Sequence, residues 1–258
     1  MRLTRTACFF VLLASLCCLA PTLPSRTHGA EPRGGIRELI PDKYKERYLA
    51  WKADFLSTET GRSQWALYAQ DEHFTLTLTV SDEDRHGAGT GKYKWDEEGR
   101  LVAATINLGC RIDEGYPNPI YYPVMNALAQ GTPPLVTNGH VLAAAKIAHE
   151  FGHVKQVASI EGAHYRLQNQ LIPAYNQILL SNGRNTRDPR LVALAQQMGG
   201  TPVEIWESRE YWGEVNAMRY LRDRITDAGE QRALFTRIRR TVELYAKDYV
   251  ERFEQVTH

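Results

Sequence analysis

The stretch GHVLAAAKIAHEFGHVKQVAS, residues 139–159, decides how the rest of the chain must be arranged. It is rich in alanine, the residue with the highest helix propensity, and it contains no proline. Asn138 and Gly139 stand where the cap of a helix is expected. Small and apolar residues flank the central HEFGH, so the pattern predicts a largely buried helix over residues 139–159.

The two histidines of HEFGH have the spacing of a metal site. His149 and His153 are four residues apart, so on a helix both imidazoles lie on one face and can reach one ion. Glu150 is rotated about 100° from His149 and can take a proton from water without being a ligand. A zinc ion with three protein ligands keeps a fourth position for that water. The alternative is a pair of solvent-facing histidines beside an unrelated acid.

Gly152, between the two histidines, supports the first interpretation. Glycine inside a helix costs up to about 1 kcal/mol relative to alanine, and a purely structural helix has little reason to carry it. We therefore expect Gly152 to leave space beside the site.

The first half of the chain predicts a small sheet. Residues 31–41 have the composition of a linker, and residues 42–58 have helical spacing. Residues 73–80 alternate apolar residues with threonines, as in a half-buried strand. KYKW (92–95) and RLVAATINLG (100–109) predict two more strands around a turn, and we expect the sheet to be antiparallel.

The second half predicts helices. Their expected ranges after the 139–159 helix are 163–180, interrupted near Pro173, then 188–198, 201–225 and 228–256. Asp188 is the expected cap of one helix, and Thr201 with Glu204 forms a capping box at the start of another. Strands followed by helices indicate an α+β fold, with one domain over residues 31–258.

Residues 1–30 predict a signal peptide. Arg2 and Arg5 precede an apolar run of about 14 residues, which is short for a membrane span of about 20. We therefore expect a secreted or periplasmic protein, with a lipid or membrane anchor as the alternative. Removal of the signal leaves Cys110 as the single cysteine, which excludes an internal disulfide and a cysteine-rich zinc finger.

The charge balance predicts few kinds of partner. The chain has 31 Lys and Arg against 30 Asp and Glu, with a formal net charge of +1. We therefore expect no nucleic-acid partner. Because the apolar run of residues 1–30 is short and is expected to be removed, we also expect no stable membrane span in the mature chain. The sequence leaves the oligomeric state open.

HEFGH at 149–153 and the E-x-x-A pattern at 214–217 together resemble the gluzincin branch of the HExxH zinc metallopeptidases. The metzincin branch carries a glycine and a third histidine where this chain has Gln156 and Ser159. The resemblance implies a zinc site made by the two histidines and a glutamate of the 201–225 helix. It also implies peptide-bond hydrolysis, with Glu150 as general base acting on a peptide or protein substrate.

Two glutamates compete as the third ligand. Glu214 fits E-x-x-A, and the small Ala217 would let the two helices lie close together, so Glu214 is the first choice. Gluzincins commonly carry an acid four residues after the ligand, and that position holds Met218. Glu210 as ligand, with Glu214 in that supporting position, is the alternative.

The resemblance carries further expectations. An edge strand, here 101–108, binds the substrate in extended form, and a Tyr, His or Arg stabilises the oxyanion. The candidates for the oxyanion are His164, Tyr165, Tyr211 and Tyr220. Two other functions stay open: a catalytically weak or inactive binding protein of the same fold, and a zinc amidase acting on a non-protein substrate.

Overall fold

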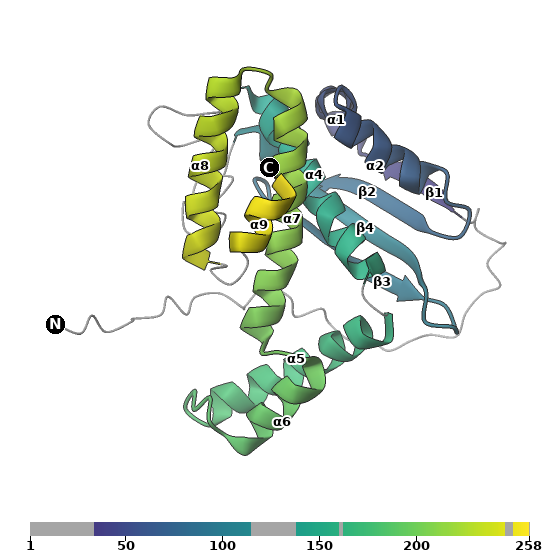
Figure 1. Cartoon of the computed structure of the whole chain (residues 1–258). Coiled ribbons are helices and arrows are strands. Elements are labelled where there is room, and N and C mark those ends of the chain that lie inside the picture. The colour runs from purple at the N-terminus through teal and green to yellow at the C-terminus, as the bar shows by residue number, and fades with distance from the viewer. Residues whose placement is uncertain (1–33, 115–137, 160–161, 246–249, 258) are drawn as a thin grey trace, which may run out of the picture. The chain divides into compact units, whose positions relative to one another are not determined.

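The computed structural model describes residues 34–114, 138–159, 162–245 and 250–257 (Figure 1). The predicted signal peptide therefore lies outside the described residues. The elements follow one another as β1 (Gly35–Leu39), α1 (Asp42–Leu56), α2 (Glu59–Ala69), β2 (Thr75–Ser81), β3 (Ala88–Trp95), β4 (Leu101–Gly109), the short 3-10 helix η1 (Ile112–Glu114), α4 (Gly139–Ser159), α5 (Gly162–Ser181), α6 (Pro189–Met198), α7 (Pro202–Arg224), α8 (Ala228–Tyr245) and α9 (Val250–Thr257). The predicted α+β class is confirmed.

The sheet is mixed rather than antiparallel, which corrects the prediction. Its strand order is β1-β2-β4-β3, with β1 and β4 both parallel to β2, and only β3 antiparallel to β4. For β1 and β2 the reason is their connection, because α1 and α2 form a crossover that returns the chain in the same direction. The prediction of a linker over 31–41 was also wrong, since Gly35–Leu39 pairs with β2 as an edge strand.

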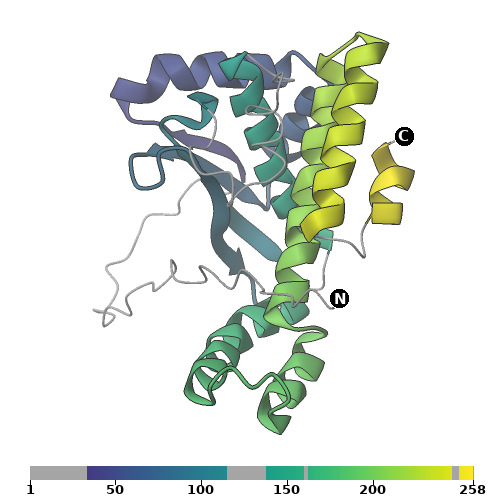
Figure 2. The same ribbon diagram turned by 90° about the vertical axis from the view of Figure 1, so that its left-hand side faces the viewer.

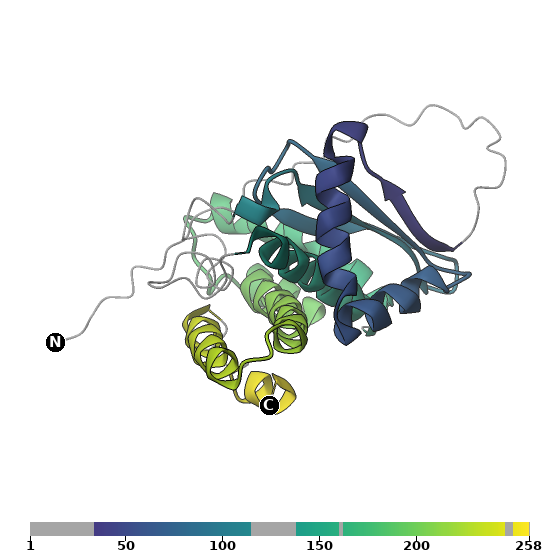
Figure 3. The same cartoon turned by 90° about the horizontal axis from the view of Figure 1, so that it is seen from above.

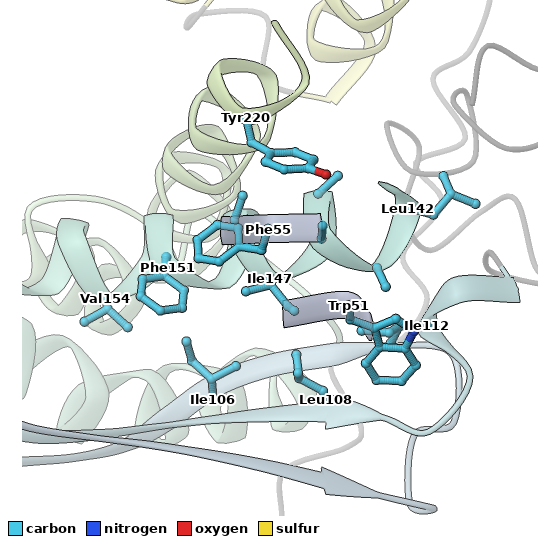
Figure 4. Packing of buried hydrophobic residues seen from close by; sticks show 14 of the residues in the cluster. Trp51, Phe55, Ile106, Leu108, Ile112, Leu142, Ile147, Phe151, Val154 and Tyr220 are labelled. Atoms are coloured by element: carbon cyan, nitrogen blue, oxygen red, sulfur yellow. The ribbon is translucent and has the colours of Figure 1, made fainter. Parts of the chain in front are cut away.

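Alternation along β2 and β4 divides the sheet into a core face and an outer face. Leu76, Leu78 and Val80 of β2 are buried, while the threonines between them are partly exposed. Their core-facing counterparts on β4 are Ala104, Ile106 and Leu108. The core face packs against aromatic and aliphatic side chains of α1, α4 and α7, of which Figure 4 labels Trp51, Phe55, Ile147, Phe151 and Tyr220.

Helix α4 occupies the centre of the fold, between the sheet and α7 (Figure 3). It spans Gly139–Ser159, as predicted, and Asn138 Oδ1 accepts from the backbone N–H of His140 at 2.9 Å to cap it. Most of its residues are buried, including the polar Lys146, His149 and Glu150. A helix buried on several sides can bring polar groups together out of contact with bulk water.

The remaining helices surround this centre. Helices α5 and α6 pack on one another near the N-terminal end of α7 and share a small apolar cluster with Ile205 of α7, and α8 lies beside α7 (Figure 2). The predicted caps are confirmed, because Asp188 caps α6 and Thr201 with Glu204 forms the capping box of α7. Helix α5 continues through Pro173, and the single helix predicted over 228–256 is divided into α8 and α9. Within the described ranges, no helix is long and apolar enough to cross a membrane.

Candidate metal centre

Helices α4 and α7 place two histidines and a glutamate in one group. His149 and His153 come from successive turns of α4, and their ring centroids are 4.7 Å apart with perpendicular planes. Glu210 from α7 faces both rings: one carboxylate oxygen lies 3.5 Å from His149 Nε2, and the other lies 3.9 Å from His153 Nε2. One possible ligand atom from each of the three residues lies within 4.8 Å of the others, so the group could hold a metal ion.

The donors of this group fit a small divalent cation. Ligands at about 2.0–2.1 Å from a tetrahedral zinc ion are about 3.3 Å from one another. The separations of 3.5 and 3.9 Å from Glu210 to the two Nε2 atoms are close to that value. His149 is almost fully buried, and the side chains of His153 and Glu210 are 14% and 17% exposed. The site is therefore largely shielded, with some exposure to solvent at His153 and Glu210.

Glu214 lies on the other side of the His149 ring. Its Oε1 atom is 3.6 Å from His149 Nδ1, and the residue is 4% exposed. Glu210 and Glu214 share one face of α7 because they are four residues apart. The crossing of the helices sets the earlier turn of α7 opposite both Nε2 atoms and the later turn opposite Nδ1. The arrangement thus favours the alternative from the sequence, with Glu210 as ligand, over the first choice, Glu214.

Burial keeps the two imidazoles in the form that binds metals. Removal from water lowers the pKa of His149 to about 3, and the nearby Lys146 ammonium lowers it further, while Glu150 acts in the opposite direction. The pKa of His153 is also lowered, first by burial and then by His149. Both rings are therefore neutral near pH 7 and can offer a nitrogen lone pair to an ion.

Glu150 points into the protein interior next to this group and is not one of its three members. The residue is 1% exposed, and its Oε2 accepts a hydrogen bond of 2.8 Å from the Thr90 hydroxyl of β3. Its Oε1 lies 3.8 Å from Nζ of Lys146, one turn earlier on α4. The sequence analysis missed both partners. The i, i+4 spacing of Lys146 and Glu150 was a usable signal, whereas the contact with Thr90 is purely tertiary.

Two glycines allow α4 and α7 to approach closely at the site. A Cβ atom on Gly152 would lie 2.5 Å from the Trp212 carbonyl oxygen. A Cβ on Gly213 would lie 2.6 Å from Cε1 and Nε2 of His149. Gly152 was expected to leave space beside the site, and the backbone of α7 occupies that space. Gly213 is its counterpart on α7, which the sequence analysis did not predict. Asn216 fixes the same crossing, because its Nδ2 donates to the Ala148 carbonyl of α4 and its amide pairs with Gln64 of α2.

Substitution of Gly213 by Ala is expected to displace the His149 ring and to weaken metal binding by more than about tenfold. The added methyl cannot be accommodated without moving the ring or separating the helices, and overpacking of this kind costs about 1–3 kcal/mol. Zinc competition titrations and thermal unfolding would measure both effects. Gly89→Ala is the control, because a Cβ there meets nothing within 4 Å. Unchanged zinc affinity in Gly213→Ala would contradict the packing argument.

Of the predicted oxyanion candidates, Tyr165 is linked to the surroundings of the metal group through Tyr93 and Arg209. Its buried ring contacts that of Tyr93 edge-on at 5.1 Å, and the Arg209 guanidinium lies over it at 4.5 Å. Arg209 directly precedes Glu210 in α7. Burial raises the pKa of the Tyr93 phenol, with smaller contributions from Tyr165 and from the charge of Glu150. Tyr93, which the sequence analysis did not single out, therefore belongs to the same neighbourhood.

The other three candidates have different environments. The Tyr220 hydroxyl donates to Asp54 and joins α7 to α1. His164 lies within hydrogen-bonding distance of Gln168, at 3.1 Å, and its ring packs beside Gly199 at the end of α6. Tyr211 lies under the guanidinium of Arg252 from α9, at 5.5 Å. These contacts place all three in the packing between helices.

The strand at the edge nearest the metal group is β3, which corrects the expectation for residues 101–108. Strand β4 lies inside the sheet between β2 and β3, so both of its backbone edges are paired. Strand β3 has β4 as its neighbour on one side and contacts α4 through Thr90. Its pairing becomes irregular between Gly91 and Lys94, where Lys92 has a φ of 50°.

Comparisons of the chain with protein-family models, with curated proteins and with solved structures give no match. The interpretation of this centre therefore depends on its own geometry and chemistry.

Proposed function

We propose that the protein is an exported zinc metallopeptidase that hydrolyses peptide bonds. The single observation that carries this proposal is the pair of carboxylates around His149. Glu210 faces its Nε2 together with that of His153, and Glu214 faces its Nδ1. Metal-binding histidines commonly place their second nitrogen against a carboxylate, which fixes the ring and its tautomer. Export rests on the pattern of residues 1–30.

The donor set supports zinc as the metal. Two imidazoles and one carboxylate are a common catalytic set for zinc, with a fourth position left for water or substrate. Calcium and magnesium prefer sets made of oxygen donors, which this group does not offer. When bound, zinc supplies a polarised water and stabilises negative charge on the attacked carbonyl.

Glu150 is the proposed general base. It follows His149 directly, and its carboxylate is anchored by Thr90 and faces the Lys146 ammonium. In the proposed reaction it accepts the proton of the attacking water and then gives it to the leaving amine. Among the described strands, β3 has a neighbour on one side only, so its other backbone edge is the one to which we propose that an extended peptide adds. Tyr165 and Tyr93 are the proposed donors to the oxyanion.

With Glu210 as the ligand, the missing acid at position 218 no longer supports an inactive binding protein of the same fold. With Glu214 as ligand, the supporting acid four residues later would be replaced by Met218. With Glu210 as ligand, Glu214 itself stands in that position and lies 3.6 Å from His149 Nδ1. The complete set of groups favours an enzyme over a binding protein.

Purified protein is expected to contain about one zinc ion per chain and to cleave members of a fluorescence-quenched peptide library. Treatment with 1,10-phenanthroline should abolish cleavage, and added zinc should restore it, because the attacking water depends on the metal. Elemental analysis and fluorescence would measure the two properties. Zinc binding without cleavage of any peptide would support the binding protein or the amidase instead. Protein that takes up no divalent metal would contradict the peptidase and the amidase.

A further inference from the structure

One contact joins the edge strand to the general base. The Thr90 hydroxyl of β3 lies 2.8 Å from Oε2 of Glu150 and 3.1 Å from the main-chain oxygen of the same residue. Thr90 pairs in regular register with Ile106 of β4, whose side chain is fully buried in the core. Side chains of directly opposed strand residues share one face of a sheet, so Thr90 is directed toward α4 by the register itself.

Thr90 gives the Glu150 carboxylate a contact from outside α4. Glu150 and Lys146 both belong to α4, so their contact leaves the carboxylate free to shift relative to the sheet. The hydroxyl of Thr90 fixes the second carboxylate oxygen to a different element. A glutamate side chain has several rotatable bonds, and contacts on both oxygens restrict them.

We propose that Thr90 is a positioning residue, which holds the Glu150 carboxylate in a fixed place relative to strand β3. This inference rests on the proposed function. A peptide that adds to β3 is held by that strand's backbone, and the base that serves its scissile bond is held by a side chain of the same strand. The same strand thus holds both the substrate and the base. Irregular pairing begins just after Gly91, so Thr90 lies in the last regularly paired part of β3 before the bulge.

Three variants separate the hydroxyl from the shape of the side chain. Thr90→Val keeps the shape and removes the donor, and Thr90→Ser keeps the donor. Thr105→Val is the matched control, because Thr105 lies on the neighbouring strand β4 at a position opposite Gly91, on the outer face. Circular dichroism and thermal unfolding would check folding, and Thr90→Ala would replace Thr90→Val if the valine variant did not fold.

The first measurement uses the library peptide that the wild-type protein cleaves fastest. Thr90→Val is expected to lower kcat about ten- to a hundredfold, because small displacements of catalytic groups reduce rates on this scale. KM should change less than about twofold, since the backbone edge of β3 is intact. Thr90→Ser should retain most of kcat, and Thr105→Val should behave as wild type.

The second measurement does not depend on turnover. Acetohydroxamate binds divalent zinc through its two oxygens and offers a hydrogen to a neighbouring carboxylate, so its affinity reports where Glu150 lies. Calorimetry on zinc-loaded protein should show about tenfold weaker binding in Thr90→Val, recovery in Thr90→Ser, and equal zinc content in all variants. These results would support the role of Thr90 even if no library peptide were cleaved. The absence of cleavage would by itself contradict only the proposed peptidase activity.

Three results would overturn the role of Thr90. Equal kcat and equal hydroxamate affinity in wild type and Thr90→Val would show that Thr90 has no positioning role, without affecting the proposal of a zinc site. Equal losses in Thr90→Val and Thr90→Ser would show that the hydroxyl is not responsible. A wild-type protein that takes up no zinc would remove both the site and the inference.

Discussion

Replacement of Glu150 by Gln is expected to lower kcat for peptide hydrolysis by about a thousandfold while the zinc content stays at the wild-type level. An amide cannot accept the proton of the attacking water, and general-base catalysis contributes about 10²–10⁴ to a rate. Zinc should remain because Glu150 is not in the group of His149, His153 and Glu210. Kinetics on a quenched peptide together with elemental analysis would measure both quantities.

The buried surroundings of Glu150 determine how this experiment must be controlled. Glutamine keeps an oxygen for the Thr90 hydroxyl, but it removes the negative charge that lies 3.8 Å from Lys146 Nζ. Removing one member of a buried ion pair destabilises a protein, so a lower Tm is expected and rates should be compared well below it. Glu72→Gln, at an exposed turn, is the control. A kcat within tenfold of wild type would assign the base to another residue.

The parts of the fold that the sequence predicts well have local causes. The bounds of α4 follow from its alanines and from the cap at Asn138. The start of α7 follows from the reciprocal hydrogen bonds of Thr201 and Glu204. Strand β2 follows from its strict alternation. Each of these signals lies within a few residues of the element that it specifies.

The parts that could not be predicted depend on distant pairing. Strand β1 pairs along one side with β2, and its five residues are too short and too exposed to show an alternation. The parallel pairing of β1 with β2 depends on where the α1–α2 crossover packs. The position of β4 inside the sheet, which moved the expected substrate edge to β3, depends on its pairing with both β2 and β3.

The choice between Glu210 and Glu214 shows the same limit at the site. The two residues lie one turn apart on the same face of α7, so periodicity treats them equally. The choice depends on how far α7 is shifted along α4, and the contacts of Gly152 and Gly213 set that shift. A glycine inside each of two helices that share a site was the available signal, because it marks where their backbones can touch. The resemblance to the E-x-x-A pattern directed attention to Ala217 instead.

The third ligand is tested by comparing two alanine variants one turn apart. Glu210→Ala should lose zinc on dialysis, with an affinity lower by about a thousandfold or more, because it removes one of three protein ligands. Glu214→Ala should keep zinc with an affinity lower by about ten- to a hundredfold, the usual effect of losing a carboxylate behind a metal-binding histidine. Competition with a zinc-sensitive dye would measure both affinities, with Glu72→Ala as the exposed control.

The difference in zinc affinity between the two variants separates direct ligation from a general charge effect. Both glutamates lie close to His149, so loss of either removes a negative charge from the site. A purely electrostatic contribution would make the two variants similar. Direct ligation makes them differ by at least about tenfold, since only Glu210 also faces His153, at 3.9 Å from its Nε2. If Glu214→Ala lost zinc and Glu210→Ala kept it, Glu214 would be the ligand, and α7 would have to be shifted by one turn along α4 in the metal-bound protein.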